Sequence, residues 1–207
     1  DALGLMAASP SPRVQAAAHY YQFGRLAAAG AAAEPDARSE GAAHRDALAR
    51  IAQTTDDAQV YAWAWRACRR APENAPGACM QLGAAQWTRI DPDNAEAWLA
   101  AAEEARRHKD DAALDDAMFH VAAAERHDPG RVALAAVIAD YTPHDERPLL
   151  GTHLAIAQAV RIDAVAAAEW QGLSEYCSAG ATAEANRRET CERVAAMLAD
   201  RSTSVAA

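Results

Sequence analysis

The sequence predicts an all-α fold in which about nine or ten helices pair as antiparallel helical hairpins. Alanine, the strongest helix former, supplies 59 of the 207 residues, and β-branched and aromatic residues are scarce between the turn signals. Within these stretches apolar residues recur at i, i+3, i+4 and i+7, which is the spacing of one helix face. Proline, glycine, aspartate and asparagine separate the stretches, as expected where one helix ends and the next begins. The chain is long enough to bury a core, and we predict a single domain over residues 1–207.

The N-terminal segment, residues 1–54, is expected to contain two helices. Ser11, which precedes a proline, begins a helix of about 20 residues that ends at Gly30. Ser39 is a suitable N-cap for the second helix, which extends to Ile51.

The middle segment, residues 55–163, begins with two further helices. Thr55 or Asp56 is expected to cap the first of them, because short polar side chains accept hydrogen bonds from the first helical N–H groups. The second is expected to run without interruption from about Pro76 to Ile90.

Residues 89–98 read RIDPDNAEAW and mark a boundary between two helices. Pro92 cannot continue the first helix, and Asp93 with Glu96 predicts an Asp-x-x-Glu capping box for the second. The same kind of punctuation recurs at Pro129, which also follows an aspartate. This stretch therefore separates two similar structural units.

The rest of the chain predicts two more pairs of helices. One pair, at about 131–141 and 147–162, flanks a loop of residues 142–148. That loop is rich in ionisable residues, which exposure to solvent explains. The other pair forms a C-terminal hairpin within residues 164–207.

The ends of alternate helices indicate a repeat. Arg-Ile or Arg-His pairs begin at Arg50, Arg89, Arg126 and Arg161, which are 39, 37 and 35 residues apart. A two-helix unit of this length cannot bury its own apolar stripe, so successive units are expected to stack on one another. The repeat therefore predicts a short α-solenoid.

The clearest unit spans residues 91–129. Its matching positions are Pro92, Trp98, Ala101, Ala105 and Pro129, together with the turn Lys109-Asp110. With a tryptophan near the start of the first helix and small residues three and seven places later, this unit resembles a tetratricopeptide repeat (TPR). The neighbouring units match that pattern in part.

The resemblance implies a protein-binding role, in which the first helix of the unit lines a concave groove. The residues that would meet a partner are Glu96, Leu99, Glu103, Arg106 and Arg107, with Asp110 and Asp111 at the turn. Trp98 is implied to be a packing residue. In the preceding helix Trp63 lies off the face shared by Tyr61 and Trp65, so it is either an exposed anchor for a partner or covered by a neighbouring helix.

Four cysteines form two local pairs, Cys68 with Cys79 and Cys177 with Cys191. Each pair joins the end of one predicted helix to the start of the next, where Cα separations suit a disulfide. We predict both disulfides, which indicate an oxidising compartment such as a bacterial periplasm or the exterior. The alternative is four reduced and buried thiols. Neither spacing fits the ligands of a structural zinc ion.

The formal charge of −9 argues against nucleic acid or an anionic membrane as the partner, since phosphate groups require clustered Lys and Arg. From Asp91 to Asp128 eleven acidic residues accompany four basic ones, a net of −7. This acid is either a solvated helix face or a site for a basic protein partner. No apolar run approaches the roughly 20 residues of a membrane span.

Residues with catalytic chemistry form no recognisable motif. Asp116 and His120 are one helical turn apart, and His127 lies seven residues further on, so these side chains could share a face. Such spacings also arise by chance on charged helices. We therefore predict no enzymatic activity, no cofactor and no bound metal.

The leading hypothesis is an exported, disulfide-linked helical repeat protein that binds another protein, for example an immunity protein or inhibitor that neutralises a toxin or an envelope enzyme. The alternatives are an envelope assembly scaffold, an oligomerising structural module, and a helical enzyme with an unrecognised site. The chain starts at Asp1 without a basic stretch followed by an apolar one, so we expect any signal peptide to be absent from it.

Overall fold

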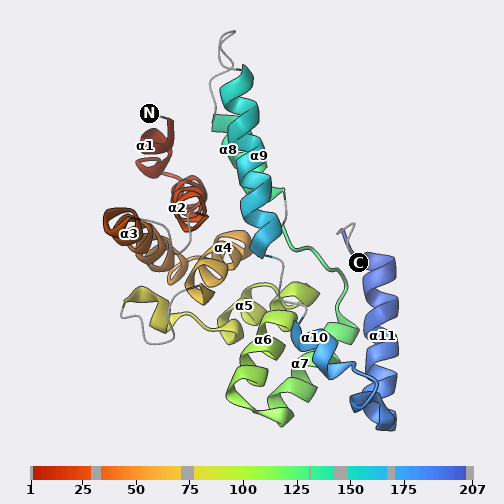
Figure 1. Ribbon diagram of the computed structural model, residues 1–207. Coiled ribbons are helices and arrows are strands. Elements are labelled where there is room, and N and C mark those ends of the chain that lie inside the picture. The colour runs from red at the N-terminus through yellow and green to blue at the C-terminus, as the bar shows by residue number, and fades with distance from the viewer. Residues whose placement is uncertain are drawn as a thin grey trace. The chain divides into compact units, whose positions relative to one another are not determined.

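The computed structural model describes residues 2–28, 34–70, 77–130, 132–141, 149–166 and 171–203. Within these ranges the chain forms eleven α-helices and two 3-10 helices, with no strand (Figure 1). The predicted all-α fold is confirmed, with somewhat more helices than expected. Gly30, Pro76 and the loop of residues 142–148 lie outside the described residues.

The chain folds into two compact units, each assembled from two separate stretches of sequence. The first combines Asp1–Leu82 with Gly130–Ala166, and the second combines Gly83–Pro129 with Ala167–Ala207. The first unit contains α1 (Ala2–Ala7), α2 (Pro12–Ala27), α3 (Pro35–Ala52), α4 (Ala58–Arg69), η2 (Ala78–Gln81), α8 (Ala133–Tyr141) and α9 (Leu149–Ala166). The second contains α5 (Ala84–Ile90), α6 (Ala95–His108), α7 (Asp111–Ala123), α10 (Gln171–Tyr176), η4 (Ala181–Ala183) and α11 (Ala185–Arg201). These boundaries cut across the three segments predicted from the sequence.

Helix starts in the first unit are close to the predicted ones, with local shifts. Helix α3 begins at Pro35, four residues before Ser39, because proline is well suited to the first helical position. Asp57 caps α4, in place of the predicted Thr55 or Asp56. It accepts hydrogen bonds from the N–H groups of Gln59 and Val60.

The predicted single helix up to Ile90 is wrong, since two separate elements occupy its described part. The 3-10 helix η2 ends before Leu82, which is extended, and α5 begins after Gly83, which is extended too. The N–H of Ala78 donates to the carboxylate of Asp46 at 2.7 Å, which fixes η2 against α3. Hydrogen bonding across the unit therefore prevails over local helix propensity here.

The core of the first unit forms where α2, α3 and α4 pack together. Trp63 is fully buried at 0% exposure and stacks on Tyr20, with ring centroids 5.8 Å apart. The prediction that Trp63 contacts a partner is therefore wrong, because α2 covers it. Gly24 allows α9 to approach α2, since a Cβ on this residue would lie 2.7 Å from Ile162.

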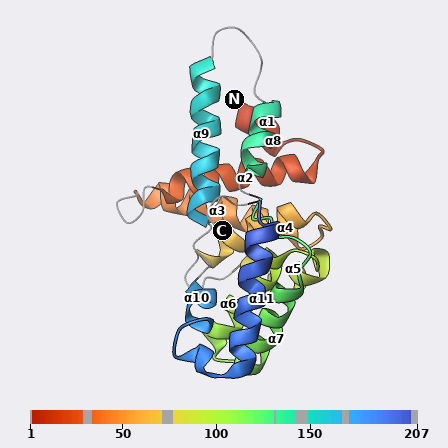
Figure 2. The same cartoon turned by 90° about the vertical axis from the view of Figure 1, so that its right-hand side faces the viewer.

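The core of the second unit forms around the α6–α7 hairpin. Lys109, in the left-handed conformation at φ 57°, ends α6, and Asp110 caps α7 by accepting a hydrogen bond from the N–H of Ala113. Helix α11 packs along α7 and α10 packs on α6 (Figure 2). The buried core includes Leu99, Leu114, Met118, Val121, Tyr176, Val194, Met197 and Leu198.

The serial stacking of a solenoid is not confirmed. The hairpin that follows α7 in sequence, α8 with α9, packs on α2 of the first unit. The α6–α7 hairpin instead packs against α10 and α11, which are distant in sequence. The apolar stripe of the predicted repeat unit is thus covered by the C-terminal hairpin, and not by the next repeat.

Both predicted cysteine pairs are at disulfide distance. Cys68 and Cys79 join the end of α4 to η2 with Cα atoms 5.4 Å apart, and Cys177 and Cys191 join the end of α10 to α11 with Cα atoms 5.7 Å apart. No described cysteine is left as a free thiol. The two pairs are consistent with an oxidising location. Among the described helices, none combines the length and the apolar character that crossing a bilayer requires.

Candidate functional site

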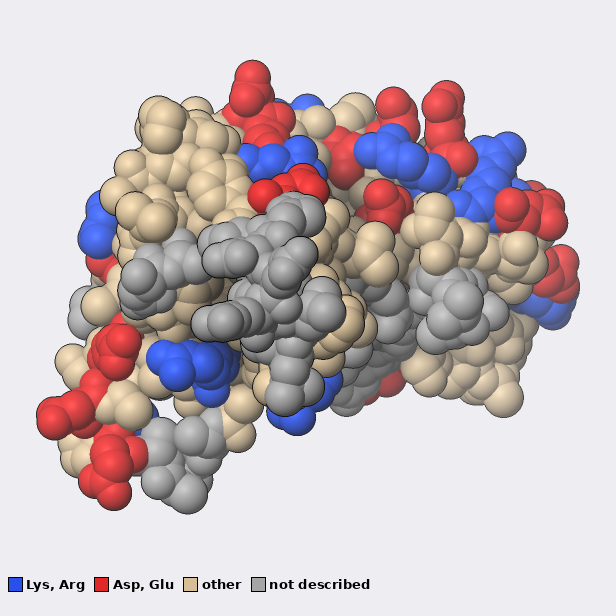
Figure 3. Space-filling model, turned by 90° about the horizontal axis from the view of Figure 1, so that it is seen from above, with Lys and Arg blue, Asp and Glu red and all other residues tan. Residues whose placement is uncertain are grey.

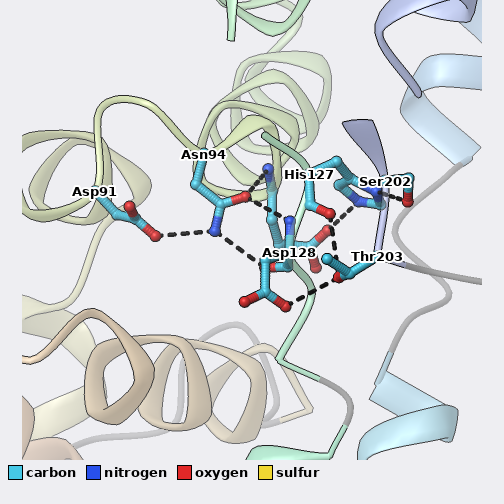
Figure 4. Close-up of polar contacts among 7 residues, drawn as sticks. Asp91, Asn94, His127, Asp128, Ser202 and Thr203 are labelled. Carbon is cyan, nitrogen blue, oxygen red and sulfur yellow. Dashed lines mark hydrogen bonds and ion pairs between the residues drawn. The ribbon is translucent and has the colours of Figure 1, made fainter. Parts of the chain in front are cut away.

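Asp91 and Asn94, at the boundary between α5 and α6, form the centre of a buried polar junction in the second unit (Figure 4). Asn94, and not the predicted Asp93, caps α6, since its side-chain oxygen accepts from the N–H of Glu96. That oxygen also accepts from the N–H of Asp128, while the Asn94 amide donates to Asp91 and to the carbonyl oxygen of Asp128. The predicted capping box is therefore wrong, because Glu96 is engaged elsewhere.

The junction also connects the segment after α7 to the start of α6. Arg126 forms an ion pair with Asp91, and its carbonyl oxygen accepts from the N–H of Ala95 at 2.8 Å. The N–H groups of Glu125 and Arg126 both donate to the carbonyl oxygen of Asp93. Asp91 and Arg126 belong to successive repeat ends in the sequence, so these two repeat ends contact each other directly.

A chain of side-chain hydrogen bonds runs from Glu96 through His127 to Ser202. The Nε2 atom of His127 lies 3.0 Å from Glu96 Oε2, and its Nδ1 atom lies 2.7 Å from the Ser202 hydroxyl oxygen. His127 is 0% exposed and Glu96 only 2%. Thr203 adds a contact to Asp128 at 3.3 Å, so the end of α11 is attached to the α6–α7 hairpin (Figure 4).

The order acid, histidine, serine resembles a hydrolase relay, so its chemical capability has to be assessed. Acyl transfer requires N–H donors that are available to a developing oxyanion next to the serine. The N–H groups nearest the hydroxyl are already used: Ser202 donates to Leu198, Thr203 donates to His127, and His127 donates to Arg201. Among the described residues the relay therefore connects the end of α11 to the segment that follows α7.

The predicted partner-binding face of α6 is largely internal, which corrects the expected positions of three residues. Glu96 lies in the junction, Leu99 is 2% exposed in the core, and Glu103 is 5% exposed. The reason is that α10 packs over this face of α6. A Cβ on Gly172 of α10 would lie 3.0 Å from Glu103 Oε2, so the two helices approach closely there.

Arg106 supplies the hydrogen bonds that the buried Glu103 carboxylate needs. The two side chains form a bidentate pair, with distances of 2.9 Å from Nε and 2.8 Å from NH2. This hydrogen bonding is the main reason that the pKa of Arg106 is raised above its ordinary value. Arg106 also contacts Glu175 of α10 at 3.3 Å, so its role is to hold α10 on α6.

The other predicted site residues have varied surroundings. Arg107, Asp110 and Asp111 are exposed, as are Pro92 and the neighbouring Asp93. The small residue Ala105 is buried and Ala101 is partly buried, as packing positions require, and Pro129 is buried. Of the predicted partner-binding set, only the residues near the turn after α6 are therefore at the surface.

The described surface includes an aromatic row that the sequence analysis missed, formed by Trp98, His120, Phe119 and Arg193. Trp98 of α6 stacks on His120 of α7, with centroids 3.9 Å apart and ring planes 12° apart. Phe119 meets His120 edge-on at 5.7 Å, and the Arg193 guanidinium lies 5.6 Å from the Phe119 ring centre. Phe119 is 52% exposed.

Acidic side chains accompany the aromatic row along α7. Asp116 is 71% exposed beside His120, and Asp115 is 52% exposed beside Arg187 of α11. Asp111, in the first turn of the same helix, is exposed as well. On the face shown in Figure 3, by contrast, red and blue side chains lie beside one another. The row on α7 therefore combines aromatic rings with a locally acidic helix.

A cavity lies outside this region, in the first unit. Within the described residues, no group of three or more His, Cys, Asp or Glu side chains could hold a metal ion. A cavity of about 520 Å³ in the first unit is lined by α2, α9 and the end of α4, with Arg70 and Arg161 among its lining residues. None of the predicted site residues lines it.

Comparisons with protein-family models, with curated proteins and with solved structures found no match to this chain.

Proposed function

We propose that this protein is a binding module that recognises a basic protein through the aromatic row on α7 and the carboxylates beside it. The observation that carries the proposal is the exposure of Phe119, 52%, within a stacked set that also contains a tryptophan and an arginine. Aromatic and arginine side chains dominate the energetics of protein interfaces. The row is also held in place by stacking, so little side-chain entropy is lost on binding.

The charge of α7 supports a basic partner. Asp111 and Asp116 are exposed on the helix that carries Phe119, Asp115 is exposed but pairs with Arg187, and the whole chain has a formal charge of −9. A cationic partner surface would be attracted at long range, and its contact with the rings would exclude water. The rate of association is then expected to fall as salt is added.

The compartment and biological role follow as parts of the same proposal. The protein acts in a bacterial periplasm or outside the cell, which the two cysteine pairs at disulfide distance support. There it neutralises a toxin or an envelope enzyme by covering a basic surface. The α6–α7 hairpin, with its tight turn and its partly buried Trp98, supports a TPR-like unit as the origin of the scaffold.

Photo-crosslinking tests the proposal. A photo-reactive phenylalanine analogue replaces Phe119, and the protein is irradiated in an extract of the source organism's cell envelope. The control carries the analogue at Leu154, which is 61% exposed in the first unit. We expect a basic protein crosslinked from position 119 only. Equal crosslinking from both positions, or capture of acidic proteins, would contradict the proposal.

A further inference from the structure

Two histidines of the first unit meet between neighbouring helices. His19 of α2 and His44 of α3 have their Nδ1 atoms 2.9 Å apart, and both side chains are only partly exposed. One of the two nitrogens must accept if this contact is a hydrogen bond, so at least one ring is neutral. Neutral imidazole is also the form that binds metal ions.

The separation of the nitrogens fits chelation of one ion. With metal–nitrogen bonds of about 2.0 to 2.1 Å, nitrogens 2.9 Å apart correspond to an angle of about 90° at the metal. A tetrahedral ion such as Zn²⁺ would prefer a separation of about 3.3 Å. Angles near 90° are those of tetragonal sites, in which Cu²⁺ is favoured over the other divalent ions of the first transition row.

The surroundings supply a partner for the second nitrogen of one ring. Glu40 Oε1 lies 3.7 Å from His44 Nε2, one helical turn away on α3. A metal on Nδ1 requires the proton to sit on Nε2, where this carboxylate is beyond hydrogen-bond distance but attracts the N–H electrostatically. Arg50, one of the nearby cations, is neutralised by its ion pair with Asp46.

We propose that His19 and His44 form a two-histidine site for a divalent copper ion, coordinated through both Nδ1 atoms with water in the remaining positions. Binding replaces the proton shared by the two nitrogens, and that proton moves to an Nε2 atom, so the metal connects α2 to α3. Since α2 and α3 already pack along one another, little rearrangement is needed. The site lies in the first unit and is independent of the α7 surface.

Copper titration of the full chain tests the site, with calorimetry for affinity and electron paramagnetic resonance for the ligands. We expect one Cu²⁺ per chain and hyperfine splitting from two nitrogens. His19→Gln and His44→Gln should each weaken binding at least tenfold and leave a single-nitrogen signal. His120→Gln, in the second unit, is the matched control and should change neither. Circular dichroism establishes that each variant is folded.

A second readout is thermal unfolding. Copper should raise the melting temperature of the unchanged protein and of His120→Gln, because it binds the folded chain, but not that of His19→Gln. Zn²⁺ should bind more weakly than Cu²⁺. Absence of binding, or equal affinity in His19→Gln, His44→Gln and the unchanged protein, would overturn the proposal and leave the pair as a hydrogen bond only.

Discussion

Helices α6 and α7 carry the same number of carboxylates but use them differently. Glu96, Glu103 and Glu104 of α6 all have partners inside the second unit: His127, Arg106 and the N–H of Ala84. Asp111, Asp115 and Asp116 of α7 are exposed. The two helices belong to one hairpin, so the difference arises from what packs on each.

The carboxylates of the two helices differ because different segments, most of them distant in the sequence, pack on each helix. Helix α10 and the segment around His127 cover α6. His127 pairs with Glu96, while Arg106 of α6 itself pairs with Glu103 and the N–H of Ala84 at the start of α5 donates to Glu104. Helix α11 packs on the apolar side of α7 and pairs its Arg187 with Asp115, while Asp111 and Asp116 stay exposed. All three carboxylates of α6 therefore have partners within the fold, whereas two of the three on α7, Asp111 and Asp116, are exposed to a partner.

We expect the largest loss of stability when the Glu96–His127 pair is broken. Glu96→Ala leaves the fully buried His127 without its carboxylate, and we expect a loss of about 4 kcal/mol in unfolding free energy. Urea denaturation followed by circular dichroism measures it. Asp116→Ala, which removes a carboxylate beside His120 on α7, is the matched control. A similar loss in both variants would contradict the assigned roles.

The second-largest loss of stability is expected when the disulfide between α10 and α11 is removed. Replacing Cys177 and Cys191 together with serine opens a short loop, and we expect a loss of about 3 kcal/mol, because the unfolded chain gains freedom. Denaturant titration of the double variant and the unchanged protein measures this loss of unfolding free energy. Thiol counting in denaturant without reductant should find no free thiol in the unchanged protein, whereas four thiols would refute both bridges and the compartment that they indicate.

Alkaline pH should weaken the packing of α10 on the core of the second unit. Burial, with a hydrogen bond to Asp115, raises the pKa of Tyr176 to about 12. The folded state favours the neutral phenol, so its contribution to stability is complete below pH 10 and is lost as the pH rises toward 12. Absorbance titration of the unchanged protein and of Tyr176→Phe isolates this ionisation. A midpoint near pH 10 would contradict burial of the ring.

The smallest expected effects on stability are on α7 itself. Asp111→Ala should change the unfolding free energy by less than about 0.5 kcal/mol, because the side chain is exposed. The melting temperature measures this in the same series of variants. A loss comparable with that of Glu96→Ala would show that α7 also depends on its carboxylates for folding.

The sequence predicted what depends on neighbours along the chain, and failed where distant segments meet. The cysteine pairs follow from short loops between helices, and the Lys109-Asp110 turn follows from local capping. By contrast, Asn94 rather than Asp93 is the cap because it also binds Asp128, and Glu96 is buried because His127 reaches it. The burial of Trp63 depends similarly on Tyr20, more than forty positions earlier in the chain.

The aromatic row was missed for the same reason. Trp98 carries the strongest local signal, yet its relation to Phe119 and Arg193 requires the packing of α6, α7 and α11. The available clue was Phe119 next to His120 on a helix whose other residues are mostly alanine and aspartate. Periodicity alone assigned α7 to the repeat scaffold and did not identify its outward face.

The affinity of the partner crosslinked from position 119 tests the contrast between the two helices most directly. Calorimetry compares the unchanged protein with Phe119→Ala and with Leu154→Ala, a similarly exposed residue of the first unit. We predict at least tenfold weaker binding for Phe119→Ala, which corresponds to about 1.4 kcal/mol, and less than a twofold change for Leu154→Ala. Equal affinity of all three proteins would contradict a binding role for α7.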